Sequence, residues 1–512
     1  MDSSKKLPLT IPHAAARAAA LWGDAPAIVE RGESWSFKQL WTECRAATSA
    51  LLARGIGQGD RVAIWAPNSR EWVVAAVAAM TAGAAIVPLN TRLKGIEAGD
   101  QLRRTGAKLM FTVHDFLGID YRGLLANEDL PDLAETVMID TGLAEFVASG
   151  RGPDDPAIPA SLDRIGADTL SDIMFTSGTT GSPKGVLTTH GRIIPQCASW
   201  IGNTGLSAGE RYLIVNPFFH SFGMKVGWVA CLLAGAVMVP MPQFEVEAAA
   251  ASIARDRISF LPCPPTIFQM LLAKLEKKPF DISSLRGGST GAAVVPPILI
   301  ERIRGELGMS DIITAYGMTE CLNITSCRPG DSAERIANTC GTAFPGNEVR
   351  IAADDGAELP RGETGEILVR GPAVMLGYLD DPQATAEAID PQGWLHTGDV
   401  GTMDADGFLR ITDRKKDMYI SGGFNCYPAE VEKLLSTHPA ISMVAIIGIP
   451  NQRLGEVGKA FVVLRPGATA SEADLVAWSR ENMANYKVPR QFVFLADLPR
   501  NAAGKVAKRE LG

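Results

Sequence analysis

An αβ pattern that occurs twice limits which folds this chain can adopt. Residues 82–89 read AGAAIVPL, and residues 234–241 read AGAVMVPM. In each copy an apolar helical stretch precedes a glycine that can end the helix. The β-branched run that follows the glycine favours a strand. We therefore expect one αβ unit to be used twice, in two related subdomains.

Apolar runs of strand length recur elsewhere, with helical patterns between many of them, and this predicts an α/β fold. The runs lie at residues 61–65, 212–215, 312–316, 365–369 and 443–448. Hydrophobic residues make up 46% of 512 residues, enough for a large core and too many for a chain that is mainly disordered. The formal net charge of −8 argues against a general nucleic-acid-binding protein.

Nothing in the sequence indicates a membrane span or a secretory signal. The apolar segments at residues 72–89 and 226–241 are interrupted by glycine and are too short or too rich in small residues for a span of about 20 residues. The start of the chain, MDSSKKLP, has no apolar stretch after its lysines. The eight cysteines form no CxxC pair, which favours buried, reduced thiols over a zinc site. We expect a cytoplasmic protein without a transmembrane segment.

The character of the chain changes near Asp413. Before it, residues 365–371, 393–401 and 407–413 have the pattern of an antiparallel sheet. The residues from Asp413 onward contain 14 lysines and arginines against 10 aspartates and glutamates, a charge of +4 in a chain whose net charge is −8. A small basic domain on a large acidic one suggests a lid over an anionic ligand. Chance variation in charge is the alternative.

The strongest single motif is MFTSGTTGSPKGV at residues 174–186. Glycines allow a close approach of the backbone to an anion, and backbone N–H groups and hydroxyls donate hydrogen bonds to it. Lys184 adds a positive charge. The segment is not a Walker A loop, because a proline precedes Lys184 and a glycine follows it. A flexible linker is the alternative, but a linker does not require this order of residues.

A second segment, GGSTG at residues 287–291, matches the G-x-S-x-G nucleophile elbow of serine hydrolases. That elbow requires a strong strand directly before the serine, and residues 281–286 (DISSLR) offer at most a short one. Because His396 and His438 lie downstream, a catalytic triad stays open as a less favoured alternative.

Three further segments carry candidate functional groups. Residues 314–320 (TAYGMTE) follow a predicted strand and would place an aromatic ring, a hydroxyl and a carboxylate at its carboxyl end, where α/β sheets bind ligands. Residues 394–399 (WLHTGD) place a carboxylate after a turn. Residues 499–505 (PRNAAGK) place a lysine on a tight turn. Taken singly, each also fits a structural role, as a core tyrosine, a turn aspartate or a solvated lysine.

Together these segments resemble the adenylate-forming superfamily of acyl-CoA synthetases, luciferases and peptide-synthetase adenylation domains, over nearly the whole chain. The resemblance implies an N-terminal AMP-binding and acyl-binding domain (residues 1–412) of two α/β subdomains plus a β-barrel-like one. It also implies a hinge (residues 413–417) and a small, mobile C-terminal α+β domain (residues 418–512). The implied reaction has two halves: a carboxylate and MgATP form acyl-AMP and pyrophosphate, and the thiol of CoA then displaces AMP. No carrier-protein domain is visible, which favours free CoA as the acceptor.

The resemblance assigns nucleotide-binding roles by matched motif. It implies that the phosphates of ATP are bound by Thr176, Ser177, Gly178, Thr179, Thr180, Gly181 and Lys184. The adenine would stack on Tyr316 in a pocket with Gly291, Ala292, Ala293 and Gly317. Thr319 would contact the phosphates, Glu320 would bind Mg²⁺, and Asp399 and Arg414 would hold the ribose.

The remaining assignments concern chemistry and domain movement. Lys505 would bridge the carboxylate and the α-phosphate during adenylation, with Lys184 and Thr319 also in contact with the reacting groups. His220 matches a residue that guards the approach of the acyl group and the thiol. Lys416 occupies the hinge position, and Gly422 and Gly423 match the stretch beside the pantetheine tunnel.

The segments at residues 214–220, 263–268, 314–320, 413–430 and 498–505 resemble most those of bacterial ligases that activate the propanoate side chain of a hexahydroindane-dione derived from steroid rings. Fatty acids of medium or long chain and aryl acids of the cinnamate type are the alternatives. We expect the acyl pocket to be lined from residues 220–225, 266–270, 288–291 and 321–325. Within it, Lys225 is either a lysine that reaches the surface or a donor to a ring carbonyl. The expected partners are the carboxylic acid and CoA, and a homodimer is left open.

Overall fold

The computed structural model describes residues 7–176, 183–291, 295, 297–353, 355–414, 419–426, 428–499 and 508–511, the side chains of residues 412–414, 425, 429, 433 and 509 excepted. The chain forms two compact units. The larger contains Met1–Thr91, Gln101–Met174 and Val186–Thr412, and the smaller contains Arg92–Asp100, Phe175–Gly185 and Asp413–Gly512.

The first subdomain is built on a seven-stranded sheet in the order β17-β8-β7-β4-β3-β5-β6. The neighbouring strands from β7 to β6 in this order pair in parallel. Parallel neighbours need a crossover connection, and helices provide it here. The strands are β3 (Arg61–Trp65), β4 (Ala85–Pro88), β5 (Leu109–Thr112), β6 (Glu135–Met138), β7 (Leu170–Thr176), β8 (Lys184–Thr189) and β17 (Gly377–Tyr378). The helices are α2 (Phe37–Ala53), α3 (Arg70–Ala82), α4 (Gly95–Thr105), α5 (Tyr121–Leu124), α6 (Leu143–Ala148) and α7 (Ala157–Leu162).

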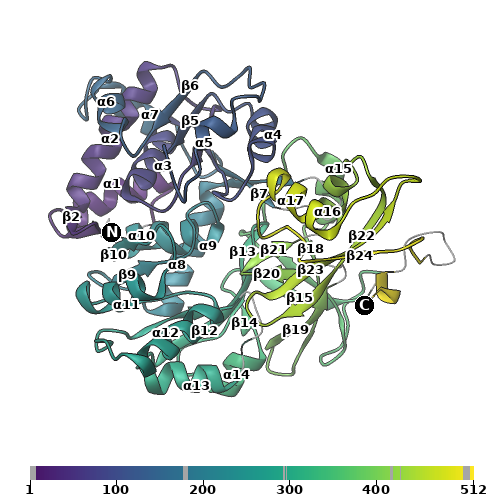
Figure 1. Ribbon diagram of the computed structural model, residues 1–512. Helices are drawn as coiled ribbons and strands as arrows, with labels where there is room; N and C mark the ends of the chain where they lie inside the picture. The colour runs from purple at the N-terminus through teal and green to yellow at the C-terminus, as the bar shows by residue number, and fades with distance from the viewer. Residues whose placement is uncertain are drawn as a thin grey trace. The chain divides into compact units, whose positions relative to one another are not determined.

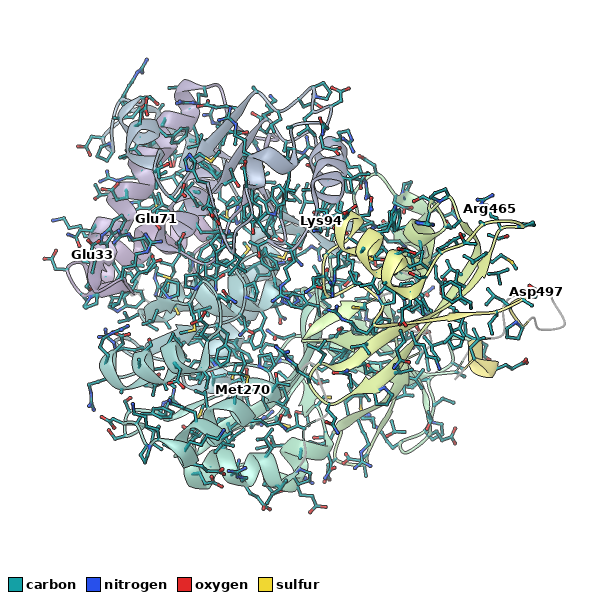
Figure 2. The ribbon with its side chains drawn as sticks, viewed as in Figure 1. Glu33, Glu71, Lys94, Met270, Arg465 and Asp497 are labelled. Atoms are coloured by element: carbon teal, nitrogen blue, oxygen red, sulfur yellow. The ribbon has the colours of Figure 1, made fainter. Side chains whose placement is uncertain are left out.

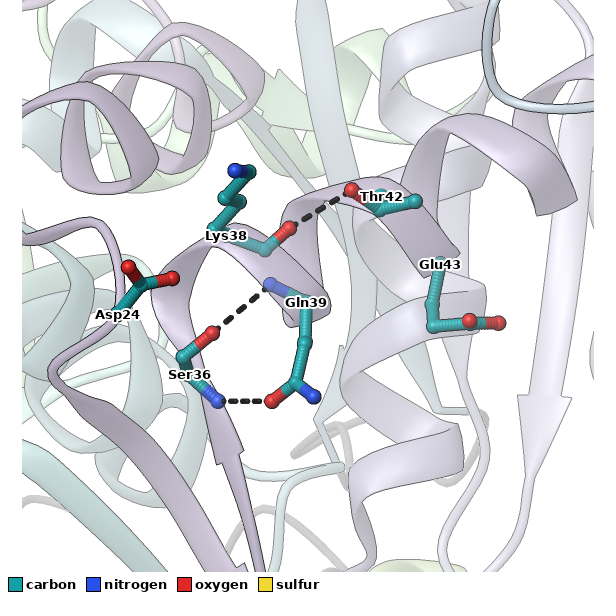
Figure 3. A pocket seen from close by; sticks show the side chains of 6 residues that line it. All are labelled: Asp24, Ser36, Lys38, Gln39, Thr42 and Glu43. Atoms are coloured by element: carbon teal, nitrogen blue, oxygen red, sulfur yellow. Dashed lines mark hydrogen bonds between the residues drawn. The ribbon is translucent and has the colours of Figure 1, made fainter.

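Helix α2 begins with a reciprocal cap. The Ser36 hydroxyl accepts a hydrogen bond from the Gln39 backbone N–H at 3.1 Å, and the Gln39 side chain accepts one from the Ser36 N–H at 2.8 Å (Figure 3). Six side chains line the polar hollow around this cap: Asp24, Ser36, Lys38, Gln39, Thr42 and Glu43. None of these residues belongs to the predicted site. The hollow surrounds the N-terminus of α2, and its polar side chains follow from the capping of that helix.

The second subdomain contains two four-stranded sheets, in the orders β2-β1-β10-β9 and β11-β12-β13-β14. Its strands are β1 (Pro26–Glu30), β2 (Glu33–Ser36), β9 (Arg211–Ile214), β10 (Val237–Pro240), β11 (Gly287–Thr290), β12 (Asp311–Met318), β13 (Cys321–Ser326) and β14 (Thr342–Ala343). Its helices are α1 (Ile11–Trp22), α8 (His190–Thr204), α9 (Ser221–Gly223), the π-helix η2 (Met224–Val229), α10 (Ala230–Ala234), α11 (Val246–Arg255), α12 (Pro265–Lys277), α13 (Pro297–Glu306) and α14 (Ala333–Asn338). Helix α1 packs against α2 and α3 (Figure 1).

The repeated αβ unit is confirmed. Helix α3 ends at Gly83, whose φ is 96°, and β4 follows; helix α10 ends at Gly235, whose φ is 75°, and β10 follows. Positive φ is strained for residues with a Cβ atom, so glycine ends both helices for the same reason. The two strands lie in different sheets, one in each subdomain.

The third subdomain is an antiparallel sheet in the order β15-β16-β18-β19, as the pattern before Asp413 predicts. It contains β15 (Glu348–Ala352), β16 (Gly365–Arg370), α15 (Pro382–Ala388), β18 (Leu395–Met403) and β19 (Leu409–Arg414). Buried Ile351, Ile367, Val369 and Leu395 lie in its core.

The C-terminal part of the smaller unit is an α+β domain. It contains β20 (Tyr419–Ser421), β21 (Phe424–Cys426), α16 (Pro428–Leu435), β22 (Ile441–Asn451), β23 (Gly455–Leu464), α17 (Glu472–Asn482), β24 (Gln491–Phe494) and the short 3₁₀-helix η3 (Lys508–Glu510). Strands β22 and β23 pair along almost their whole length, and Val431, Leu435, Ile446 and Leu475 form the core between sheet and helices. The predicted α/β fold with a small C-terminal α+β domain is confirmed.

Candidate active site

The predicted phosphate-binding segment is described at its two ends. Thr176 is the last residue of β7 and Lys184 is the first of β8. The Thr176 hydroxyl donates to the carbonyl oxygen of Lys184 at 3.5 Å, so the two strand ends that flank the segment lie together. Between them, Ser177, Gly178, Thr179, Thr180 and Gly181 lie outside the described residues.

Tyr316 and Asp399 are 83 positions apart in the chain, and the fold brings them into direct contact. The Tyr316 hydroxyl, on β12, donates to Oδ2 of Asp399, on β18, at 2.5 Å. Both side chains are 9% exposed, so water competes poorly for this hydrogen bond. A ring that can stack on a base and a carboxylate that can accept from ribose hydroxyls therefore form one connected group.

The glycines near Tyr316 have packing reasons of their own. A Cβ atom at Gly317 would overlap the carbonyl oxygen of Leu322 on β13, so this hairpin excludes any larger residue. A Cβ atom at Gly291 would lie 2.9 Å from the carbonyl oxygen of Ala315. The neighbouring Ala292 and Ala293 lie outside the described residues.

Thr319 and Glu320 form the turn between β12 and β13. Glu320 is 7% exposed, its backbone oxygen accepts from Met375 N at 2.8 Å, and its Oε1 accepts from the Tyr378 hydroxyl at 3.0 Å. The carboxylate is therefore oriented by a tyrosine on β17. Carboxylate oxygens suit Mg²⁺, which proteins commonly bind with one or two carboxylates together with substrate phosphates, so Glu320 fits that role.

His220 caps the short helix α9. Its Nδ1 accepts a hydrogen bond from Phe222 N at 3.2 Å, so a neutral ring carries its proton on Nε2. His220 as a residue is exposed to solvent, but the protein packed around its ring, and then the charge of Lys225, lower the pKa of the imidazole to about 4. At neutral pH the imidazole is therefore uncharged and offers a hydrogen-bond donor at Nε2.

The C-terminal candidates are described only in part. Gly422 and Gly423 form the turn between β20 and β21 with φ of 59° and 83°, a geometry that glycine adopts without strain. Arg414 ends β19, and its side chain is outside the described part of the chain. Lys416 and Lys505 also lie outside it.

The serine-hydrolase alternative is not supported by the position of Ser289. The serine lies inside β11 and is 1% exposed, whereas a nucleophile elbow exposes its serine on the turn after a strand. Among the described residues its hydroxyl has no hydrogen-bond partner, histidines included.

Four residues that the sequence reasoning missed support these groups, three of them buried and one, Tyr378, half-buried. Asn68, 3% exposed, donates to the backbone oxygen of Asn216 at 2.9 Å and accepts from Phe218 N at 2.7 Å, which anchors the loop before His220. Glu366 accepts from Gly398 N at 3.1 Å, next to Asp399. The others are Tyr378, described above, and Asp172. A polar residue inside an apolar run was the available signal for Asp172, in LSDIMF.

Lys225 does not reach the surface. Its side chain is 1% exposed, and its Nζ lies 3.0 Å from Oδ1 of Asp172, which is fully buried. The interpretation of Lys225 as a surface lysine is therefore wrong. The reason is that a carboxylate on a strand of the first subdomain supplies a buried counter-charge that the local sequence around Lys225 does not reveal.

The sequence profile of AMP-binding enzymes matches residues 15–379, and that of the AMP-binding enzyme C-terminal domain matches residues 430–505. The chain belongs to the AMP-binding enzyme family. The predicted membership of the adenylate-forming superfamily is thereby confirmed.

This AMP-binding enzyme has curated relatives along almost its whole length. It is 48% identical to the 3-(7a-methyl-1,5-dioxo-octahydro-1H-inden-4-yl)propanoyl:CoA ligase of Mycobacterium tuberculosis, over 98% of this chain and 99% of the relative. It is 45% identical to the ligase of the same name from Rhodococcus jostii, over 98% of both chains. Among solved structures it is similar to a double mutant of o-succinylbenzoate CoA synthetase of Bacillus subtilis bound to a product analogue, with a TM-score of 0.85, 30% identity, and coverage of 99% of this chain and 98% of that one.

No helix in the described part of this AMP-binding enzyme is long and apolar enough to cross a membrane.

Proposed function

We propose that this chain is an ATP-dependent acid–CoA ligase whose acid is the hexahydroindane-dione propanoate that remains after steroid rings are opened. The observation that carries the proposal is the match of nearly the whole chain to two bacterial ligases named for this acid. The names of those relatives state this acid as their substrate, and we infer the same substrate for this chain.

In the first half-reaction a carboxylate oxygen of the acid attacks the α-phosphorus of ATP. The bond from that phosphorus to the bridging oxygen breaks, and pyrophosphate leaves. Tyr316 and Asp399 hold the adenosine, and the segment between Thr176 and Lys184 binds the phosphates. Lys505 neutralises charge where carboxylate and phosphate meet, because two anions must approach each other there.

In the second half-reaction the thiol of CoA gives its proton to water and attacks the acyl carbonyl carbon. The bond from that carbon to the phosphate oxygen breaks, and AMP leaves. His220 is neutral at working pH, so it adds no positive charge beside the acyl group and can donate from Nε2.

Mg²⁺ would be held by Glu320, whose carboxylate Tyr378 orients. The ion supplies charge neutralisation on the phosphates when bound. Glu320 lies on the same hairpin as Tyr316, so the nucleotide base and the metal would be positioned by one structural element.

Other acids are tested as alternatives because relatives at lower identity carry their names. Feruloyl-CoA synthase of Amycolatopsis is 35% identical over 95% of both chains, and the human medium-chain acyl-CoA ligase is 33% identical over 95% of this chain. Met270, in a stretch predicted to line the acyl pocket, lies on α12 and is 47% exposed (Figure 2).

The test measures AMP and acyl-CoA formation by the purified chain with the indane-dione propanoate, octanoate and ferulate. We expect kcat/KM for the dione acid to exceed that for the other two by about tenfold or more, because a site that hydrogen-bonds the polar groups of its own substrate rejects acids that lack them. Lys505→Ala is the control for turnover by this site. A higher kcat/KM for octanoate or ferulate would refute the proposed acid, and absence of CoA-dependent AMP release with every acid would refute the ligase.

A further inference from the structure

The strongest observation outside the assigned site is the buried ion pair of Lys225 and Asp172. The side chains are 1% and 0% exposed, and Nζ lies 3.0 Å from Oδ1. Nζ also donates to the Thr188 hydroxyl at 3.3 Å, and Oδ2 of Asp172 accepts from the Ser171 hydroxyl at 2.6 Å. Burial of two charges costs desolvation that an apolar pair of similar volume avoids, so packing alone does not account for this pair.

The three elements that meet at this pair lead to two parts of the proposed site. Lys225 lies on η2, five positions after His220. Asp172 lies on β7, four positions before Thr176, and Thr188 lies on β8, four positions after Lys184. The pair therefore joins the segment after His220 to both strands that flank the predicted phosphate-binding segment.

Helix η2 has reason to need such an anchor. It is a π-helix, a form that is rarely stable by itself, and Gly227 inside it has non-helical angles, with φ of −93° and ψ of −106°. The backbone oxygen of Lys225 accepts from Cys197 Sγ on α8 at 2.9 Å. Lys225 is thus held at its backbone by a neighbouring helix and at its ammonium group by the sheet.

We propose that the Lys225–Asp172 pair positions the acyl-side helix η2 against the phosphate-side strands, so that acid and ATP are aligned for adenylation. The inference rests on the proposed ligase function. Adenylation joins two separately bound reactants, and a displacement of about 1 Å can cost on the order of 100-fold in rate. In the second half-reaction the acyl group and AMP are already joined by a covalent bond, so this alignment is no longer needed. Lys225 and Asp172 are therefore positioning residues.

The test is a double-mutant cycle in the full chain with Lys225→Met, Asp172→Asn and the combined variant. Pyrophosphate release reports adenylation, with separate KM values for acid and ATP, and thioester formation from supplied acyl-adenylate and CoA reports the second half. We expect each single variant to lower kcat of adenylation by about 10- to 100-fold. Thioester formation should stay within about threefold, because it does not depend on the alignment.

The combined variant guards against misfolding, because it removes both charges and leaves none unpaired in the core. We expect it to adenylate no more slowly than the worse single variant, since the two residues act as one unit. Lys225→Arg, which keeps the charge, should recover part of the adenylation rate. Arg54→Met is the control for loss of an ion pair elsewhere: it breaks the partly exposed Arg54–Glu135 pair, 2.5 Å from Nε to Oε2, outside the proposed site. Both half-reactions should survive in it.

Three results would overturn the inference. The first is an equal fall of both half-reactions in the folded combined variant, which would show that the pair does not act on the alignment for adenylation alone. The second is normal adenylation in that variant. The third is a loss seen only with acids that carry a ring carbonyl and absent with octanoate, which would make Lys225 a direct contact of the substrate. Failure of the wild-type chain on every acid refutes the ligase function instead, so the two failures are distinguishable.

Discussion

Replacing Tyr316 by phenylalanine removes one hydroxyl and keeps the ring. The hydroxyl donates to Oδ2 of Asp399 at 2.5 Å, and both side chains are 9% exposed. A hydrogen bond to a charged acceptor contributes about 1.5–3 kcal/mol. This hydrogen bond orients the Asp399 carboxylate, so the free energy of ATP binding that the mutation removes cannot exceed the free energy of the hydrogen bond. We expect KM for ATP to rise by about 10- to 100-fold, since each 1.4 kcal/mol is about tenfold.

The assay is pyrophosphate release in Tyr316→Phe and wild type, with ATP and with 2′,3′-dideoxy-ATP. If Asp399 binds the ribose hydroxyls, the mutation and the loss of those hydroxyls should not be additive, because they disrupt the same interaction. Asp399→Asn is the control and should show the same loss of discrimination. An unchanged KM for ATP, or an equal penalty with both nucleotides, would refute the assignment of this pair to the ribose.

Four further outcomes are expected. Lys505→Ala should abolish pyrophosphate release and spare thioester formation from supplied acyl-adenylate, and a collapse of both would contradict its role at the carboxylate–phosphate junction. Lys416→Pro should keep adenylation within about tenfold and slow thioester formation far more, because proline fixes φ at the predicted hinge; Lys416→Ala controls for the lost charge, and equal slowing of both halves would remove the hinge. Glu320→Gln should raise the Mg²⁺ concentration needed for half-maximal adenylation, and Tyr378→Phe should do so less, because it only loosens the carboxylate; a metal titration with no shift in either would count against this ligand. The pKa of His220 is lowered to about 4 from its usual 6.5, so between these two pH values the ring is neutral in the folded chain and protonated in the unfolded chain. The free energy of unfolding should therefore fall as the pH drops from 6.5 to 4. The pH–rate profile should show no step near 6.5 that His220→Ala removes.

The helices and strands are largely readable from local patterns. Residues 61–65 form β3 as expected, and the glycines at 83 and 235 end helices because positive φ suits glycine. The order of motifs along the chain is enough to predict the family, since the segment before Lys184 and the TAYGMTE segment are specific in both composition and spacing.

The contacts between these segments depend on tertiary structure, because they join residues that no local pattern relates. Tyr316 reaches Asp399 across 83 positions, and Tyr378 reaches Glu320 across 58. Lys225 reaches Thr188, 37 positions earlier, beside Asp172. A lysine in an apolar stretch is compatible with a surface position or a buried one, since its long stem packs well in both. Only the fold decides between them, by placing a carboxylate from strand β7 at 3.0 Å from its ammonium group.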